Sequence, residues 1–398
     1  MKQRSSLTKP ALIAATVLAI AALNAHAQII QQILDLGPGT SASDVCVNPF
    51  PNDPWAAGLF VAAYTPDLGY GVLSADLSRN PPEFGGIVDA FAMRNRKLVS
   101  AAGALFEVGE TMPDGNTAWH VRRSLDHGAT WQSLGTDWRL AAGKSAGAKG
   151  ATVDAAGWIF VCGRAADSRG NFHPVIRRSV DNGTSWTLAL DASKGANFDT
   201  AADIQFVAPV GSKPGGIFAV GRVGNYWTVW RSRDGGVTWL VVHSWVPSKG
   251  IAEATAITSD ANGNIYVGGM GNRVNYPRNW YVWRSLNSGD TWQDLGNTLP
   301  AATDNTINDL EVDASGSNLW VVGRSLSVAG SSQQADWTMQ RWSPAGGWSA
   351  PLFPYANLSA DSRAQAVAID ATTGWFYASG WVYETDGQQH ATVLEIGN

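Results

Sequence analysis

Short apolar runs recur along the whole chain, and each run is bounded by Gly, Asn or Asp. The run that ends at Gly163 and the run Ile265-to-Gly269 are typical, with Val, Ile, Phe or Tyr ahead of the Gly. β-Branched and aromatic residues between turn-forming residues predict strands. The runs occupy 58–64, 99–109, 153–163, 217–221, 265–269, 319–323 and 375–380.

A second pattern, Ser-x-Asp-x-Gly-x-Thr-Trp, follows four of these runs. Near-complete copies occupy 124–131, 179–186, 232–239 and 285–292, and their Trp residues are 55, 53 and 53 residues apart. A degenerate copy ends at Trp348, 56 residues later. The Asp can cap backbone donors of its own turn, the Gly supplies a left-handed residue, and the Trp buries a large face between neighbouring sheets. The pattern predicts a turn between the third and fourth strands of a repeating unit.

Seven such units fill the chain after the signal-like segment 1–27, which is described below. Residues 28–398 divided by seven give 53 residues, which is the observed spacing. The last unit ends on a third strand at 391–396, and Ile33–Gly37 matches the fourth strand of another unit, Trp292–Gly296. We therefore predict an all-β fold, a single seven-bladed β-propeller with four-stranded blades, closed by the N-terminal strand joining the last blade. Six blades, or two smaller domains, are the alternatives.

The N-terminus has the pattern of a secretory signal. Lys2, Arg4 and Lys9 precede an apolar run at 11–23, and Ala25-His26-Ala27 follows it. A basic start, a short apolar core and small residues before the cleavage site predict a signal peptide at 1–27 and a propeller at 28–398. The chain is then secreted or periplasmic, with a single-pass anchor as the alternative.

Charge and cysteine content exclude several functions. A net charge of −5 with only 15% charged residues does not indicate the basic surface that binds nucleic acid or anionic membranes. Cys46 and Cys162 fall in the first and third units, too far apart for a disulfide. No Cys or His cluster has metal-binding spacing, so we expect no metal and no cofactor. We expect a monomer whose partner is a glycan or protein ligand.

The Ser-x-Asp-x-Gly-x-Thr-Trp pattern resembles the Asp-box (BNR) repeat of the sialidase-like β-propeller superfamily. In layout the chain is most similar to single seven-bladed propellers such as the photosystem II stability/assembly factor. The resemblance to sialidases implies a Tyr nucleophile with a Glu partner, an Asp acid and an Arg triad. The only Arg-x-Pro is Arg79-Asn80-Pro81, preceded by Ser78 and not by an aromatic residue. No local motif assigns the Tyr or the Glu.

A ligand site is expected on the face opposite the Asp boxes, where the first strand of each unit begins. Alignment of the units gives a polar ring there and a second ring at the end of each second strand. The first ring is Ser43, Asn95, Lys149, Asp203, Thr255, Asn308 and Gln365, and the second is Tyr64, Glu110, Arg164, Arg222, Met270, Arg324 and Trp381. The predicted ligand-binding residues are Arg96, Lys149, Arg164, Arg222, Arg324 and Trp381. Planar guanidinium groups suit an anionic ligand.

Two functions follow from this site. The first is a recognition propeller that binds a glycan or a protein at the channel mouth, and the second is a sialidase-like glycoside hydrolase acting on an acidic sugar. The catalytic residues of the second are unknown, with four candidate acids: Asp203, Glu253, Asp309 and Glu311. A further set of residues could stack on sugar rings, but packing against adjacent blades is the interpretation we prefer. That set is Trp119, Trp227, Trp280 and Trp337.

Overall fold

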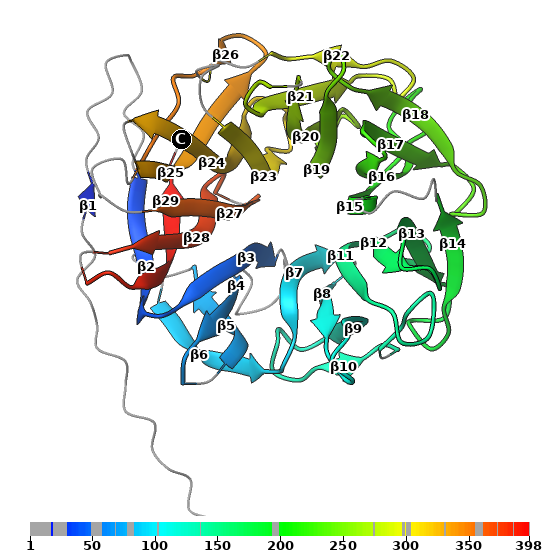
Figure 1. The fold of residues 1–398 in the computed structure, drawn as a ribbon, viewed down its shortest axis with the longest axis horizontal. Coiled ribbons are helices and arrows are strands. Elements are labelled where there is room, and N and C mark those ends of the chain that lie inside the picture. Colours follow the sequence, from blue (N-terminus) through cyan, green and yellow to red (C-terminus); the bar gives the residue numbers. More distant parts are fainter. Residues whose placement is uncertain are drawn as a thin grey trace, which may run out of the picture.

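The computed structural model is an all-β ring (Figure 1). It describes residues 17–18, 30–48, 58–67, 69–77, 83–101, 103–135, 137–192, 199–273, 275–296, 299, 304–329, 332–354, 361–371, 373–384 and 386–397. Within these ranges every regular element is a β-strand. Seven antiparallel sheets surround a central axis, and each has its first strand innermost. The predicted seven-bladed propeller is therefore confirmed.

The blades follow the chain in order, and their strands are as follows. Blade one holds β3 (Ser41–Asn48), β4 (Gly58–Thr65), β5 (Gly69–Asp76) and β6 (Glu83–Ala90). Blade two holds β7 (Arg94–Ala101), β8 (Ala104–Thr111), β9 (Ala118–Ser124) and β10 (Gln132–Ser133). Blade three holds β11 (Ala146–Val153), β12 (Ile159–Ala166), β13 (Phe172–Ser179) and β14 (Thr187–Asp191). Blade four holds β15 (Thr200–Val207), β16 (Gly216–Val223), β17 (Tyr226–Ser232) and β18 (Leu240–Trp245).

The remaining three blades complete the ring. Blade five holds β19 (Ile251–Ser259), β20 (Ile265–Asn272), β21 (Asn279–Ser285) and β22 (Gln293–Asp294). Blade six holds β23 (Asp304–Val312), β24 (Leu319–Ala329), β25 (Ser332–Ser343) and β26 (Gly347–Trp348). Blade seven holds β27 (Ser362–Ile369), β28 (Phe376–Tyr383), β29 (Gln389–Ile396) and the N-terminal β2 (Ile30–Pro38), with β1 (Val17–Leu18) outside it.

The closure of the ring is the one expected from the sequence. Strand β2 pairs antiparallel with β29, with Ile30 opposite Ile396 and Asp35 opposite Thr392. The first and last parts of the chain thus share one blade (Figure 1). Of the predicted signal peptide, only Val17 and Leu18 are described, and they pair with β2. No helix among the described residues is long and apolar enough to cross a membrane.

Each inner strand has an irregularity near its start. In blade three the pairing with β12 passes from Ala148↔Gly163 to Gly150↔Cys162, which leaves Lys149 as the extra residue of a β-bulge. Blade two has its irregular stretch between Arg94 and Lys97. The extra residues of the other blades are Ser43, Ala202, Thr255, Asn308 and Gln365.

This register corrects the predicted polar ring in blade four. The extra residue there is Ala202, and Asp203 lies one place further along β15, opposite Val220. The alignment placed Asp203 at the mouth because a bulge adds a residue without changing the polarity pattern. In blade two the predicted Asn95 and its neighbour Arg96 both fall in the irregular stretch, and their side chains lie outside the described residues.

The same bulge explains the Gly that recurs in the second strand of blades three to seven. A Cβ on Gly269 would overlap the carbonyl oxygen of Glu253 in the paired inner strand, and Gly163, Gly221, Gly323 and Gly380 face the same obstacle. A Trp from the preceding blade fills the space over the Gly in blades three, five and seven. The pairs are Trp119 on Gly163, Trp227 on Gly269 and Trp337 on Gly380.

The four Trp residues considered for sugar stacking are therefore structural. Trp119, Trp227, Trp280 and Trp337 are each at most 1% exposed. Burial of such large rings between neighbouring sheets provides much of the cohesion between blades. The packing interpretation is confirmed, and these rings present no face to a ligand.

The Ser-x-Asp-x-Gly-x-Thr-Trp segments form tight turns, which we call box turns. In blade four Asp234 accepts hydrogen bonds from the Thr238 N–H and hydroxyl at 2.8 and 2.5 Å, and the Gly236 N–H donates to Ser232 Oγ at 2.8 Å. The Thr238 hydrogen bonds lower the pKa of Asp234 to about 2. Asp126 and Asp181 make the same contacts. These aspartates cap turns, as the pattern predicted.

Candidate functional site

A pocket of about 270 Å³ opens where the inner strands of blades five, six and seven begin. This is the face opposite the box turns, where the sequence placed the ligand site. We call it the mouth pocket. Its lining residues are Glu253, Thr255, Met270, Arg278, Thr306, Ile307, Asn308, Arg324, Arg363 and Gln365.

Three arginines make the mouth pocket basic. Arg278 precedes β21 and forms a bidentate pair with Asp304, with Nε 2.7 Å from Oδ1. Arg324 on β24 donates from Nε to Thr306 Oγ1 at 3.2 Å, and Arg363 on β27 lies over the Trp381 ring at 5.2 Å. Burial and the nearby charges of Arg363 and Arg278 lower the pKa of Arg324. A bound anion would offset both the burial of the Arg324 guanidinium and the repulsion from its neighbours, so this lowered pKa favours anion binding.

Glu253 is the one acid among the described residues that line the mouth pocket. It lies on β19, opposite Met270. Burial raises the pKa of Glu253, against the opposing fields of Arg222, Lys149, Arg164 and Arg278. A carboxyl group with a raised pKa can hold its proton nearer neutrality, and so can donate a hydrogen bond or a proton to a bound group.

The other predicted ligand residues surround the mouth without lining the mouth pocket. Lys149 is 3.8 Å from Glu110, and Arg164 lies over the Phe172 ring at 4.6 Å. Arg222 donates from Nε to the Gly224 carbonyl at 2.6 Å. Trp381 packs edge-on against Tyr383 and underlies Arg363. The side chain of Arg96 lies outside the described residues. Of the six, the structure brings Arg324 to the pocket, with Trp381 behind it.

Three aspartates, Asp44, Asp203 and Asp309, each follow the extra residue of the bulge in an inner strand and so lie deeper in the channel than the mouth. Their carboxylates join adjacent blades. Asp203 accepts a hydrogen bond from the Ile257 N–H at 3.2 Å, and Asp309 accepts one from the Val367 N–H at 3.1 Å. Asp44 accepts the Leu98 N–H in the same way. Each acceptor is on the inner strand of one blade, and each donor is on the inner strand of the next. Burial raises the pKa of Asp44 to about 7 and that of Asp203 to about 6.

Lys97 supplies the positive charge among these acids. Its Nζ lies 3.3 Å from Asp309 and 3.7 Å from Asp44. Burial lowers the pKa of Lys97, but the charges of Asp309, Asp44 and Asp203 outweigh burial and leave it well above its usual value. Because β7 and β23 belong to blades two and six, this side chain spans the channel.

Glu311 lies further along β23 and accepts a hydrogen bond from Thr258 Oγ1 at 3.0 Å. Burial raises its pKa to about 8. Of the four candidate acids, Glu253 therefore lies in the mouth pocket, whereas Asp203 and Asp309 bridge blades and Glu311 lies deeper. Arg278 and Arg363 were missed by sequence reasoning, because they occupy repeat positions that the two predicted rings did not include.

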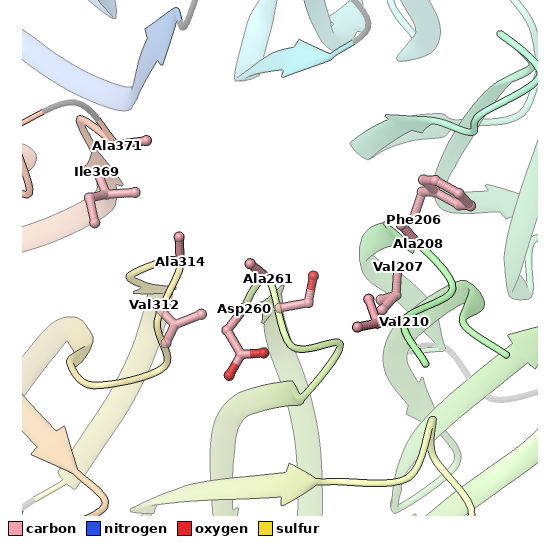
Figure 2. A pocket seen from close by; sticks show the side chains of 11 residues that line it. Phe206, Val207, Ala208, Val210, Asp260, Ala261, Val312, Ala314, Ile369 and Ala371 are labelled. Carbon is pink, nitrogen blue, oxygen red and sulfur yellow. The ribbon is translucent and has the colours of Figure 1, made fainter. Parts of the chain in front are cut away.

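The opposite end of the channel is apolar. A pocket of about 340 Å³ lies where the inner strands of blades four to seven end. Figure 2 shows small and aliphatic side chains around it, among them Val207, Val312 and Ile369. Asp260 lines it too, but its carboxylate accepts hydrogen bonds from Asn264. The two mouths of the channel thus differ in chemistry, and the basic one has the groups to bind an anion.

Comparison with protein-family models gives no match, and comparison with curated proteins gives none either. The fold is similar to the GH74 xyloglucanase from Xanthomonas campestris, with 16% identity over 91% of this chain and 55% of that chain and a TM-score of 0.56. It is also similar to a PL25 ulvan lyase bound to -[GlcA(1-4)Rha3S]-, with 11% identity, 91% and 95% coverage and a TM-score of 0.49. Trypanosoma rangeli sialidase in complex with sialic acid gives 13% identity, 76% and 54% coverage and a TM-score of 0.44.

These similarities concern the fold. The chain spans 55% of the length of the xyloglucanase. The comparisons support the β-propeller fold, and they do not show the finer resemblance to the Asp-box repeat or to the photosystem II stability/assembly factor. The fold and the site together define a seven-bladed β-propeller with a basic pocket at one mouth.

Proposed function

We propose that the mouth pocket binds an anionic carbohydrate, and that the chain is an exported recognition propeller related to the Asp-box proteins. The observation that supports the proposal most directly is the convergence of Arg278, Arg324 and Arg363 on one pocket. Arginine guanidinium groups bind carboxylate, sulfate or phosphate oxygens through paired, charge-assisted hydrogen bonds.

The rest of the pocket suits a sugar better than a bare ion. Hydroxyl and amide groups of Thr255, Asn308 and Gln365 stand beside the arginines and can pair with ring hydroxyls. Met270 gives the pocket an apolar wall. The fold similarity to a xyloglucanase is consistent with this class of ligand. The signal-like N-terminus supports secretion or export to the periplasm, where glycans are found.

Calorimetric titration tests the proposal with oligosaccharides that contain uronate or sialate, against neutral oligosaccharides of the same length. We expect binding of an acidic sugar, and Arg324→Ala should weaken it tenfold or more, since a charge-assisted hydrogen bond contributes about 1.5–3 kcal/mol. Arg164→Ala is the matched control, because Arg164 is at the mouth but does not line the pocket. Equal losses in both variants, or no binding of any acidic sugar, would refute the pocket assignment.

Glu253 supports a second candidate function, glycoside hydrolysis at the same pocket. A half-buried carboxyl with a raised pKa is the form that a general acid needs. Under this candidate Glu253→Gln should abolish release of product from a fluorogenic acidic glycoside while binding persists. Binding of the glycoside by wild-type protein without turnover would leave recognition as the function.

A further inference from the structure

Three side chains on the outer part of blade two, those of Ser133, His120 and Asp137, lie together and far in sequence from the mouth pocket. Ser133 Oγ on β10 lies 3.2 Å from Nε2 of His120 on β9. The other ring nitrogen of His120, Nδ1, lies 3.7 Å from Oδ1 of Asp137. The strands bring the first two together, since Ser133 pairs with Arg122 and His120 is two residues before Arg122 on the same face of the sheet.

The order Ser–His–Asp is the arrangement that activates a serine nucleophile. Ser133 is exposed, so that a reactant can reach its hydroxyl, and His120 is only 4% exposed. His120 Nδ1 is buried without a hydrogen-bond partner within bonding distance, and Asp137 is the acid beside it. A neutral imidazole with its proton on Nδ1, facing Asp137, leaves Nε2 free to accept the Ser133 proton.

The surroundings favour the neutral form of the ring and hold the acid in place. Burial is the main cause of a lowered pKa for His120, assisted by Arg122 and opposed by Asp137. Thr111 Oγ1 donates to Asp137 Oδ1 at 2.5 Å. Asp137 has a backbone φ of +53°, a conformation that costs energy outside glycine and is often found at functional sites. The His–Asp distance is longer than a hydrogen bond, and such contacts commonly tighten when a reactant binds.

We propose that Ser133, His120 and Asp137 form an acyl-transfer site for esters of short, uncharged acids. Ser133 Oγ attacks the acyl carbon while its proton passes to His120 Nε2. The ester C–O bond then breaks, and the leaving alcohol takes the proton from Nε2. Water, deprotonated by the same nitrogen, releases the acid and restores Ser133. Asp137 acts as a positioning residue, because it orients His120 and does not touch the substrate.

Neighbouring side chains set the substrate class. The Phe91 ring lies 4.9 Å from the His120 ring, and Met112, which follows Thr111, is exposed. Arg122 is nearby but already engaged, over Phe91 and with Glu107. The Phe91 ring against His120 gives the site an apolar wall, which fits an uncharged acyl group better than a charged one. The site is independent of the mouth pocket, which lies on blades five to seven.

Two measurements test the proposal on the full chain. A fluorophosphonate probe should label Ser133, identified by mass spectrometry of the labelled peptide. Hydrolysis of 4-nitrophenyl acetate should fall at least tenfold in Ser133→Ala, while Ser244→Ala, at an exposed serine of the outer strand in blade four, should match wild type.

The role of Asp137 has its own measurement. Asp137→Asn should lower the rate and change its pH dependence, because the field of Asp137 raises the pKa of His120. The melting temperatures of Ser133→Ala and Asp137→Asn should stay near that of wild type, since both side chains lie at the surface. Failure of the probe to label Ser133, or equal hydrolysis by wild type and Ser133→Ala, would overturn the proposal.

Discussion

His390 joins the closing strand to the last blade, and its protonation should control how firmly β2 is held. Its Nδ1 is 3.0 Å from Asp35 on β2, and its Nε2 is 3.0 Å from Asp386 in the loop before β29. Burial lowers the pKa of His390, but the hydrogen bonds and charges of Asp386 and Asp35 outweigh burial and raise it. The cationic ring donates to both acids.

The cost of losing one of these pairs follows from the contacts. A hydrogen bond to a charged group contributes about 1.5–3 kcal/mol. The side chains of His390 and Asp35 are 11% and 17% exposed, so solvent screens part of this. We therefore expect Asp35→Asn to cost about 1–2 kcal/mol, which corresponds to a roughly 5- to 30-fold increase in opening of the closing strand.

The pH dependence has a definite sign. A folded-state pKa raised above the unfolded value of about 6.5 means that the stabilisation is complete below that pH. It is lost as the pH rises through the folded pKa of His390. In wild-type protein β2 should therefore open more readily at alkaline pH than at pH 6, and Asp35→Asn should reduce this difference.

Hydrogen exchange of peptides that cover β2, corrected for intrinsic exchange rates, measures the opening directly. Asp191→Asn is the matched control. Asp191 is 2.7 Å from His173 at the equivalent place in blade three, and its loss should loosen β14 while leaving β2 unchanged. Protection of β2 that is the same at pH 6 and pH 9, or the same in Asp35→Asn and wild type, would refute this account of the closure.

Three further predictions concern stability. Gly269→Ala should lower the free energy of unfolding in urea by about 1–3 kcal/mol, because its Cβ would meet the paired strand, whereas Gly346→Ala should change it little. Lys97→Met should cost about 3–5 kcal/mol at pH 8 and less at pH 5, where the buried acids that lose their counter-charge can take up protons. The hydrogen bonds of Asp234 give stability that is present above about pH 4 and is lost as the pH falls through about 2. Asp234→Asn should therefore lose less stability between pH 4 and pH 2 than wild type, as measured by unfolding followed by fluorescence.

The sequence was sufficient to predict the blade count and the closure, because the first produces a regular spacing of residues and the second a match between two distant segments. The Trp spacing reports the length of a blade, and Ile33–Gly37 has the pattern of a missing outer strand. The position of Asp203 was wrong because the bulge inserts a residue that the polar pattern does not mark. A one-residue error in a strand moves a side chain to a different environment, here from the channel mouth to an interblade hydrogen bond.

The candidate site was harder to predict because each blade contributes residues from a different position of the repeat to the pocket. Alignment of repeats compares equivalent residues and therefore found Arg324, but Arg278 precedes a third strand and Arg363 begins an inner strand. The contact of Ser133 with His120 and Asp137 has a similar cause. It depends on cross-strand pairing and a loop within one blade, for which the sequence carries no recognisable spacing.

The salt bridge from Lys97 to Asp309 joins blade two to blade six, and neither is a neighbour of the other in the ring. Contacts between adjacent blades would survive the gain or loss of a repeat by gene duplication, because each blade meets the next in the same way. A contact across the ring depends on its circumference. An eighth blade would move the two strands apart, and a sixfold ring would crowd the three aspartates around the lysine. Because this salt bridge depends on a ring of seven blades, selection that maintains it also maintains the number of repeats. The repeats alone specify only how one blade follows another.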